Sequence, residues 1–220
     1  MTKQAGALDA STLKQRHRAM RDGQPESLRI RIHRALSWLA RAEREPDDHD
    51  ARYIFLWIAF NAVYASEFGF EQKEREQVRQ FIAQLLKLDT EQQLHRALFN
   101  QFSGPIRNLI DNRFLFEPFW RAMREHDASN AWETSFSAAK KRVLDAVMNN
   151  DTATLLSIVL DRLYVLRNQL IHGGATWGSA TNRAQVRDGV AILGVLVPVI
   201  VGLIMRVDSE GLGEVAFPVV

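Results

Sequence analysis

The sequence predicts an all-α protein. Apolar residues recur at helical spacing along most of the 220 residues, alternating β-branched runs are few, and Gly and Pro fall mostly at the expected helix boundaries. Hydrophobic residues make up 46% of the chain, so we expect a sizeable core. The predicted organisation is a polar, flexible leader over residues 1–24, one helical domain over 25–206 and a short tail over 207–220.

Two helices are predicted at the start of this domain. Pro25 suits the first position of a helix, and Pro46 ends that helix. A second helix follows, from a cap at Asp48 or Asp50 to about Phe68. Its middle part is apolar on all sides, which predicts a place at the centre of the bundle.

The segment from about residue 70 to about residue 125 is predicted to form an insertion packed on the bundle. We expect charged amphipathic helices at Glu71–Leu88 and Thr90–Phe102, followed by an irregular, aromatic-rich region at Gly104–Trp120. The sequence assigns no role to this insertion.

The remaining part of the chain is predicted to return to the bundle. Its expected elements are Asn130–Asn149, a long helix from a cap at Asp151 or Thr152 to Gly173-Gly174, a last helix at Asn182–Met205, and a short strand at Val215–Val220.

The last helix raises the question of a membrane. Residues 189–205 carry no charge, and this run of seventeen is just under the roughly 20 needed to span a bilayer. A helix buried on all sides in a bundle or dimer has the same pattern, and we expect that arrangement and no membrane span. The N-terminus lacks the apolar segment of a signal peptide, so we expect a cytoplasmic protein.

Composition excludes several kinds of chemistry. The chain has no cysteine, which rules out disulfides, thiol nucleophiles and Cys-ligated metals. The Asp47-Asp48-His49-Asp50 run is better explained by helix capping than by a metal, because consecutive residues rarely converge on one ion. We therefore predict no metal site and no cofactor.

Positive charge is unevenly distributed. The net charge is only +2, so the protein is not expected to coat nucleic acid through bulk electrostatics. Residues 1–45 nevertheless hold ten Lys or Arg against five Asp or Glu. This excess is either a basic approach surface or the solvated face of amphipathic helices.

The end of the long helix carries the most informative residues, Arg167, Asn168 and His172. Arg can clamp a phosphate through its rigid fork of donors, and His moves protons near neutral pH. On a straight helix the Arg167 and His172 side chains point about 140° apart, so either Gly173 loosens the last turn or a second subunit completes the site. Free carbonyls at this helix end favour the charged form of the imidazole.

At these residues the sequence resembles the HEPN family (higher eukaryotes and prokaryotes nucleotide-binding), whose signature is Arg, a polar residue, and His four to six residues after the Arg. The run Phe55–Ala62 is similar to the corresponding helix of larger, Abi- or Apea-like members. The resemblance covers residues 25–65 and 130–206.

This resemblance implies a helical bundle that dimerises so that two Arg/His motifs line one cleft, and a metal-independent endoribonuclease. His172 would be the general acid or base, Arg167 would stabilise charge on the phosphoryl oxygens, and Asn168 would orient the phosphate or the partner motif. The expected partners are RNA, a second copy of the chain and an antitoxin or regulatory protein, in a toxin or phage-defence setting. The alternative is a non-catalytic module that binds RNA or a nucleotide or mediates dimerisation.

Four further residues are candidates for substrate contact. Arg162 and Arg183 flank the motif and could follow an RNA backbone, although solvated surface charge is the competing interpretation. Trp177 could stack on a base or pack in a dimer. Asn61, an amide inside an apolar helix, needs a partner and could brace the motif helix or make an ordinary core hydrogen bond.

Overall fold

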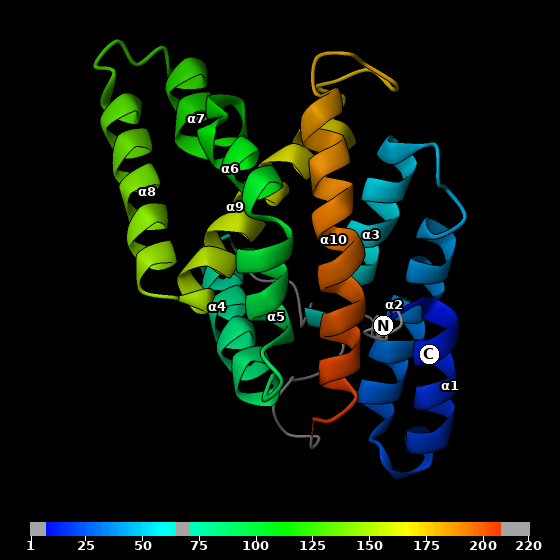
Figure 1. The fold of residues 1–220 in the computed structure, drawn as a ribbon. Coiled ribbons are helices and arrows are strands. Elements are labelled where there is room, and N and C mark those ends of the chain that lie inside the picture. Colours follow the sequence, from blue (N-terminus) through cyan, green and yellow to red (C-terminus); the bar gives the residue numbers. More distant parts are fainter. Residues whose placement is uncertain (1–7, 65–70, 208–220) are drawn as a thin grey trace, which may run out of the picture. The chain divides into compact units, whose positions relative to one another are not determined.

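The computed structural model describes residues 8–64 and 71–207, with the side chains of 8–64 and 78–207. Throughout these ranges the regular elements are helices and there is no strand, which confirms the all-α prediction (Figure 1). The strand predicted at Val215–Val220 lies outside the described residues.

The chain divides into two compact units, Met1–Leu94 with Val190–Val220, and His95–Gly189. This division differs from the predicted single domain with an insertion at 70–125. The helix that carries Arg167 and His172 belongs to the second unit, together with much of the segment predicted as an insertion.

The first unit contains five helices longer than two turns in the described ranges: α1 (Ala10–Met20), α2 (Glu26–Ala42), α3 (His49–Tyr64), α4 (Glu71–Leu88) and the part of α10 (Arg183–Ile204) from Val190 onward. A short 3-10 turn, η1 (Arg21–Gly23), links α1 to α2. The α2 and α3 helices pack side by side (Figure 1). Asp48 caps α3 as predicted, because its Oδ1 accepts the Ala51 N–H at 3.0 Å.

Helix α1 corrects the expectation of a flexible leader. Asp9 caps it by accepting the Thr12 N–H at 2.7 Å, and Leu13 is completely buried. The Ala10 N–H donates to Glu43 Oε1 at 2.8 Å, which ties the start of α1 to the end of α2. Only three of the eleven α1 residues are buried, and the other residues are mostly polar. The sequence of this segment therefore resembles that of a mobile leader.

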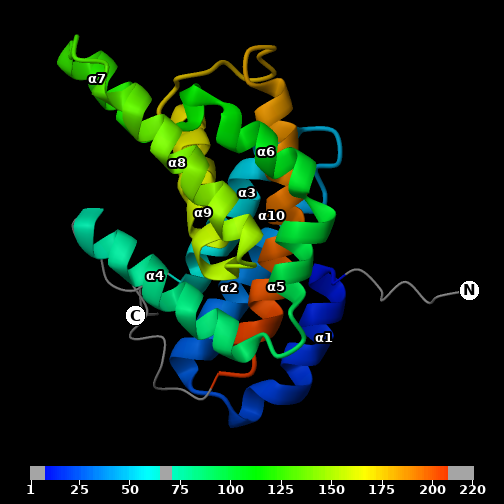
Figure 2. The same cartoon turned by 60° about the vertical axis from the view of Figure 1, so that its left-hand side comes forward.

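The second unit holds the remaining elements, which we list in chain order. They are α5 (Gln93–His95), which crosses the boundary, the π-helix η2 (Arg96–Gln101), α6 (Ser103–Asp111), the 3-10 turn η3 (Arg113–Leu115), α7 (Glu117–Glu125), α8 (Ala131–Met148), α9 (Thr152–Ile171) and the first residues of α10. Helices α8 and α9 pack side by side (Figure 2).

Two predictions in this unit were wrong. The helix expected at Thr90–Phe102 begins only at Gln93, where Asp89 accepts the Gln93 and Leu94 N–H groups at 2.8 and 2.7 Å, and it passes into a π-helix. The region expected to be irregular at Gly104–Trp120 is largely helical. Pro118 stands in the first turn of α7, where its missing N–H costs nothing, so it starts a helix instead of preventing one.

Helix α10 is long and apolar enough to cross a membrane by length and composition. In this structure 72% of its most apolar window is buried inside the protein, as in the core helix of a bundle. Pro198 lies within the helix and is buried.

Candidate functional site at the end of helix α9

Helix α9 is held at its start by a side-chain cap and along its length by a buried stripe. Asp151 Oδ1 accepts the Thr154 N–H at 3.0 Å, and the Thr154 hydrogen bonds hold the pKa of the Asp151 carboxyl below its usual value. An apolar stripe along α9 is buried at Leu155, Val159, Leu163 and Leu166, and Leu170 at its end is half-buried. The stripe fixes the rotation of α9 and therefore which residues of its last turn reach solvent.

The last turn of α9 ends in a Schellman motif. The His172 N–H donates to the Asn168 carbonyl at 3.0 Å and the Gly174 N–H to the Gln169 carbonyl at 2.7 Å, while Gly173 has φ +71°. A Cβ on Gly174 would lie 3.1 Å from the Gln169 carbonyl oxygen. Both glycines are therefore needed for this ending, and His172 becomes the exposed C-cap residue.

Arg167 is held by the next residue in the chain. Its Nη1 donates to Asn168 Oδ1 at 2.8 Å, and its guanidinium carbon lies 5.9 Å from the centre of the Tyr164 ring. Its Nε is buried without an acceptor, and no carboxylate among the described residues forms an ion pair with it. The site thus contains a half-buried guanidinium that donates to Asn168 and forms no ion pair among the described residues.

No hydrogen bond joins Arg167 to His172 in the described part of the chain. The two residues lie five positions apart in the chain, Arg167 in the last turns of α9 and His172 as its C-cap. The ordered Schellman ending differs from the loosened turn at Gly173 that the sequence offered as one option, and completion by a second subunit stays a prediction.

Gln169 was overlooked in the sequence because it lies between the motif residues. Its Nε2 donates to the Phe114 carbonyl at 2.6 Å, and its Oε1 accepts from Asn182 Nδ2 at 3.2 Å. Trp120 Nε1 donates to the same Phe114 carbonyl at 2.7 Å. Gln169 therefore links the end of α9 to η3 and to the residue before α10.

Exposed apolar side chains lie within the motif and shortly after it. Ile171 is 43% exposed and Trp177 is 78% exposed, although large apolar side chains are normally covered in a folded protein. Their position next to Arg167 and His172 in sequence fits a surface that another molecule covers.

Arg162 is not available for RNA contact in this structure, contrary to the expectation. It is only 3% exposed, Nη1 donates to the Leu115 carbonyl at 3.2 Å, and the guanidinium lies over the Phe116 ring at 4.5 Å. Burial lowers its pKa to about 10, so it stays charged at neutral pH. We assign it a packing role between α9 and the residues that follow η3.

The other predicted residues occupy varied surroundings. Arg183 is half-buried at the first position of α10. Asn61 lies on α3 of the first unit, and its Oδ1 is buried without a donor among the described residues. The expected core hydrogen bond through this oxygen is therefore absent there. Trp177 lies in the loop between α9 and α10.

Within the described ranges no three His, Asp or Glu side chains are grouped closely enough to hold a metal ion. Comparisons with known protein families, with curated proteins and with solved structures find nothing that matches this chain.

Proposed function

We propose that this protein is a metal-independent endoribonuclease of the HEPN type, active as a homodimer. The observation that carries the proposal is the pairing of Arg167 with Asn168, which positions a guanidinium without a carboxylate partner shortly before an exposed C-capping histidine. A guanidinium that already faced a carboxylate would have little attraction left for phosphate. Arg167 faces no such carboxylate among the described residues, which supports a role in attracting phosphate.

The proposed reaction needs only these side chains and the RNA. The ribose 2′-oxygen attacks the adjacent phosphorus, its proton passes to a general base, and the bond to the 5′-oxygen breaks as that oxygen takes up a proton. His172 of one copy and His172 of a second copy would serve as base and acid. Arg167 would stabilise the negative charge that grows on the phosphoryl oxygens. The products are a 2′,3′-cyclic phosphate and a 5′-hydroxyl.

Because the reaction requires the 2′-hydroxyl, RNA is the substrate and DNA is not cleaved. Exposed Ile171 and Trp177 support a second copy of the chain as the molecule that covers this end of α9. We place the activity in a cytoplasmic toxin or phage-defence setting, with an antitoxin or regulatory protein as a further partner.

The test is cleavage of a mixed-sequence RNA in EDTA. We expect cyclic-phosphate ends from the wild-type protein and a loss of at least about 100-fold in rate for His172→Ala, the usual contribution of a general acid or base. Arg167→Ala should lose about 10²–10³-fold, as when an oxyanion-stabilising donor is removed. His126→Ala is the matched control, because His126 is likewise an exposed C-cap histidine of the same unit.

His126→Ala should cleave within twofold of wild type, a margin of about 0.4 kcal/mol. Intact RNA at high protein concentration, together with RNA binding that depends on Arg167, would favour the non-catalytic binding module. Equal cleavage by His172→Ala and wild type would contradict the proposal, because it would point to a contaminating nuclease.

A further inference from the structure

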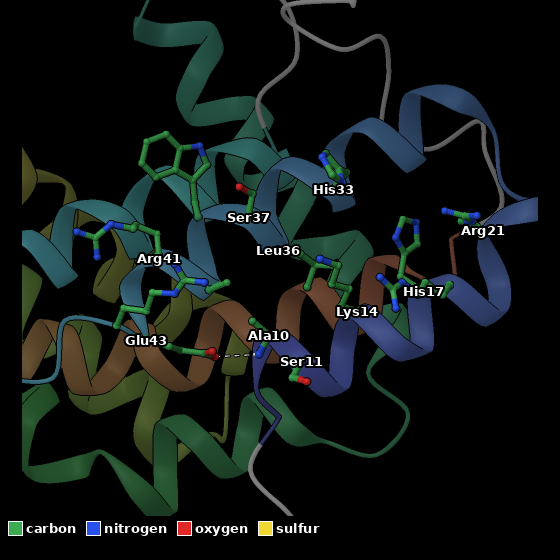
Figure 3. A pocket seen from close by; sticks show the side chains of 14 residues that line it. Ala10, Ser11, Lys14, His17, Arg21, His33, Leu36, Ser37, Arg41 and Glu43 are labelled. Carbon is green, nitrogen blue, oxygen red and sulfur yellow. Dashed lines mark hydrogen bonds between the residues drawn. The ribbon is translucent and has the colours of Figure 1, made fainter.

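A hollow of about 970 Å³ lies between α1 and α2 in the first unit. Its lining residues come from the N-terminal part of the chain and include neither Arg167 nor His172. Figure 3 shows Lys14, His17 and Arg21 on the α1 side and His33, Ser37 and Arg41 on the α2 side. We call this hollow the α1–α2 groove. It is far larger than a single phosphate needs, and it reaches the upper end of the range for small-molecule sites.

The charge of the α1–α2 groove is one-sided. Five Lys or Arg side chains line it, against one carboxylate, in a protein whose net charge is only +2; the five are Lys14, Arg18, Arg21, Arg41 and Arg44. The carboxylate, Glu43, is already engaged by the Ala10 N–H. Desolvation of this carboxyl raises its pKa above the usual value.

Three of the five cations have no ion pair among the described residues. Arg21 pairs with Asp22 at 3.5 Å and Arg41 pairs with Glu45, whereas Lys14, Arg18 and Arg44 are exposed and unpaired there. Lys14, Arg18 and Arg21 are spaced four and three residues apart, which places one cation on the same face of α1 at each turn. A row of cations at one-turn intervals suits a chain of phosphates better than a single anion.

An aromatic ring completes the α1–α2 groove. Trp38 lines it, is 37% exposed, and stacks on Phe55 with 5.7 Å between the ring centres. Because this stack already holds the indole ring in place, a base that stacks on Trp38 would cost little additional side-chain entropy. Cations that follow a backbone beside an aromatic platform are the usual means of holding a single strand without reading its sequence.

We propose that the α1–α2 groove binds the phosphate backbone of a single-stranded polynucleotide, with Trp38 stacking on a base. The lining part of α1, from Ala10 to Arg21, is roughly 16 Å long at 1.5 Å per residue, enough for a few nucleotides. The groove makes no use of Arg167 or His172. Its binding activity is therefore separate from the proposed cleavage and can be tested without it.

The test measures binding of a labelled single-stranded RNA 12-mer by fluorescence anisotropy over a range of salt concentrations. All proteins carry His172→Ala, so that the RNA stays intact. Adding Lys14→Ala and Arg18→Ala should weaken binding at least about tenfold and lower the slope of log Kd against log salt by about 1.4, or 0.7 for each lost phosphate contact. The matched control adds Arg16→Ala and Arg29→Ala, which remove two exposed charges from the same helices outside the α1–α2 groove.

The control pair should change Kd by less than threefold and leave the salt slope unchanged. Trp38→Leu keeps an apolar side chain against Phe55 and should weaken binding about fivefold or more through lost stacking. Equal losses for the two double variants would overturn the proposal, since bulk charge would then explain binding. So would equal competition by inorganic polyphosphate, or no RNA binding at micromolar protein.

The outcomes also separate this proposal from the proposed nuclease. RNA binding that depends on Lys14 and Arg18 in a protein that never cleaves RNA would support the α1–α2 groove and remove the nuclease. Cleavage that depends on His172, with RNA binding unaffected by the Lys14 and Arg18 substitutions, would support the nuclease and overturn the α1–α2 groove.

Discussion

Arg162 shows, at the scale of single residues, how burial changes what a charged side chain can do. Its guanidinium makes one hydrogen bond, to the Leu115 carbonyl, and otherwise lies against aromatic rings, while its Nε and Nη2 are buried without acceptors. Because the desolvated charge is only partly compensated, the long side chain contributes mainly through packing.

We therefore expect different results from two substitutions at this position. Arg162→Ala leaves a cavity under the Phe116 ring and should lower the free energy of unfolding by about 2–4 kcal/mol. Arg162→Met keeps most of the volume and removes two unsatisfied donors, so it should lie within about 1 kcal/mol of wild type. Urea denaturation measures both, and equal destabilisation would show that the charge itself is required.

His17 is the second residue with a testable consequence. Burial, together with the charges of Arg21, His33 and Arg29, lowers the pKa of His17, whose Nε2 is buried without a partner. Above the unfolded-state pKa of about 6.5 the imidazole is neutral in both states and its pKa has no effect on stability. As the pH falls below that value the unfolded chain takes up a proton more readily, so unfolding becomes easier.

His17→Gln should remove this acid sensitivity. Between pH 7.5 and 5.0 the melting temperature of the wild-type protein should fall by a few °C more than that of the variant, on the order expected for a chain of this length. His126→Gln is the control, because His126 is exposed and is not among the charges that lower the pKa of His17. A wild-type melting temperature that falls no more than that of His17→Gln would contradict the expected role.

At the scale of elements, the ending of α9 determines where the proposed catalytic histidine lies. The left-handed Gly173 allows the Gly174 N–H to reach the Gln169 carbonyl, an ending in which His172 is the C-cap residue. Gly173→Ala meets no atom within 4 Å, so its cost comes only from the backbone, about 1 kcal/mol.

We expect Gly173→Ala to loosen this turn and to lower cleavage about tenfold or more, since small displacements of a catalytic group have large effects on rate. Gly178→Ala is the matched control, with φ +69° and no atom within 4 Å of the added Cβ. It carries the same backbone strain outside the motif, and cleavage should stay near wild type. Equal loss of cleavage in both variants would attribute the effect to general destabilisation.

At the scale of the whole molecule, the proposed reaction requires two copies of the chain. No hydrogen bond joins Arg167 to His172 among the described residues of one copy, and exposed Ile171 lies between them in the sequence. We expect the wild-type protein to be a dimer by light scattering after gel filtration. Ile171→Asp should shift it toward monomer and reduce cleavage by at least about tenfold, because a buried unpaired carboxylate opposes association.

Met123→Asp provides the control for this experiment. Met123 is 44% exposed on α7 of the same unit, close to the 43% of Ile171, and lies outside the motif. The control should remain dimeric and active. A monomeric wild-type protein that cleaves RNA would contradict the two-copy site and would require Arg167 and His172 to meet within one chain.

The sequence by itself determined the helical class and most helix boundaries, because these depend on local signals. Apolar spacing, the Asp48 and Asp151 caps and the terminal glycines at 173 and 174 are all contained within a few residues, and each has its expected effect in the structure. The candidate motif could be located from the same local information. Its position at the exposed end of a buried helix follows from the apolar stripe before it.

Only the tertiary structure decided which distant residues meet. The Phe114 carbonyl that Gln169 reaches is 55 residues away along the chain, and Leu115, which accepts from Arg162, is 47 residues away. The start of α1 is held by a hydrogen bond to Glu43 at the end of α2. The α1–α2 groove forms where these two helices pack together, and neither helix alone would show it in the sequence. Such contacts depend on packing between separate elements, which local periodicity does not encode.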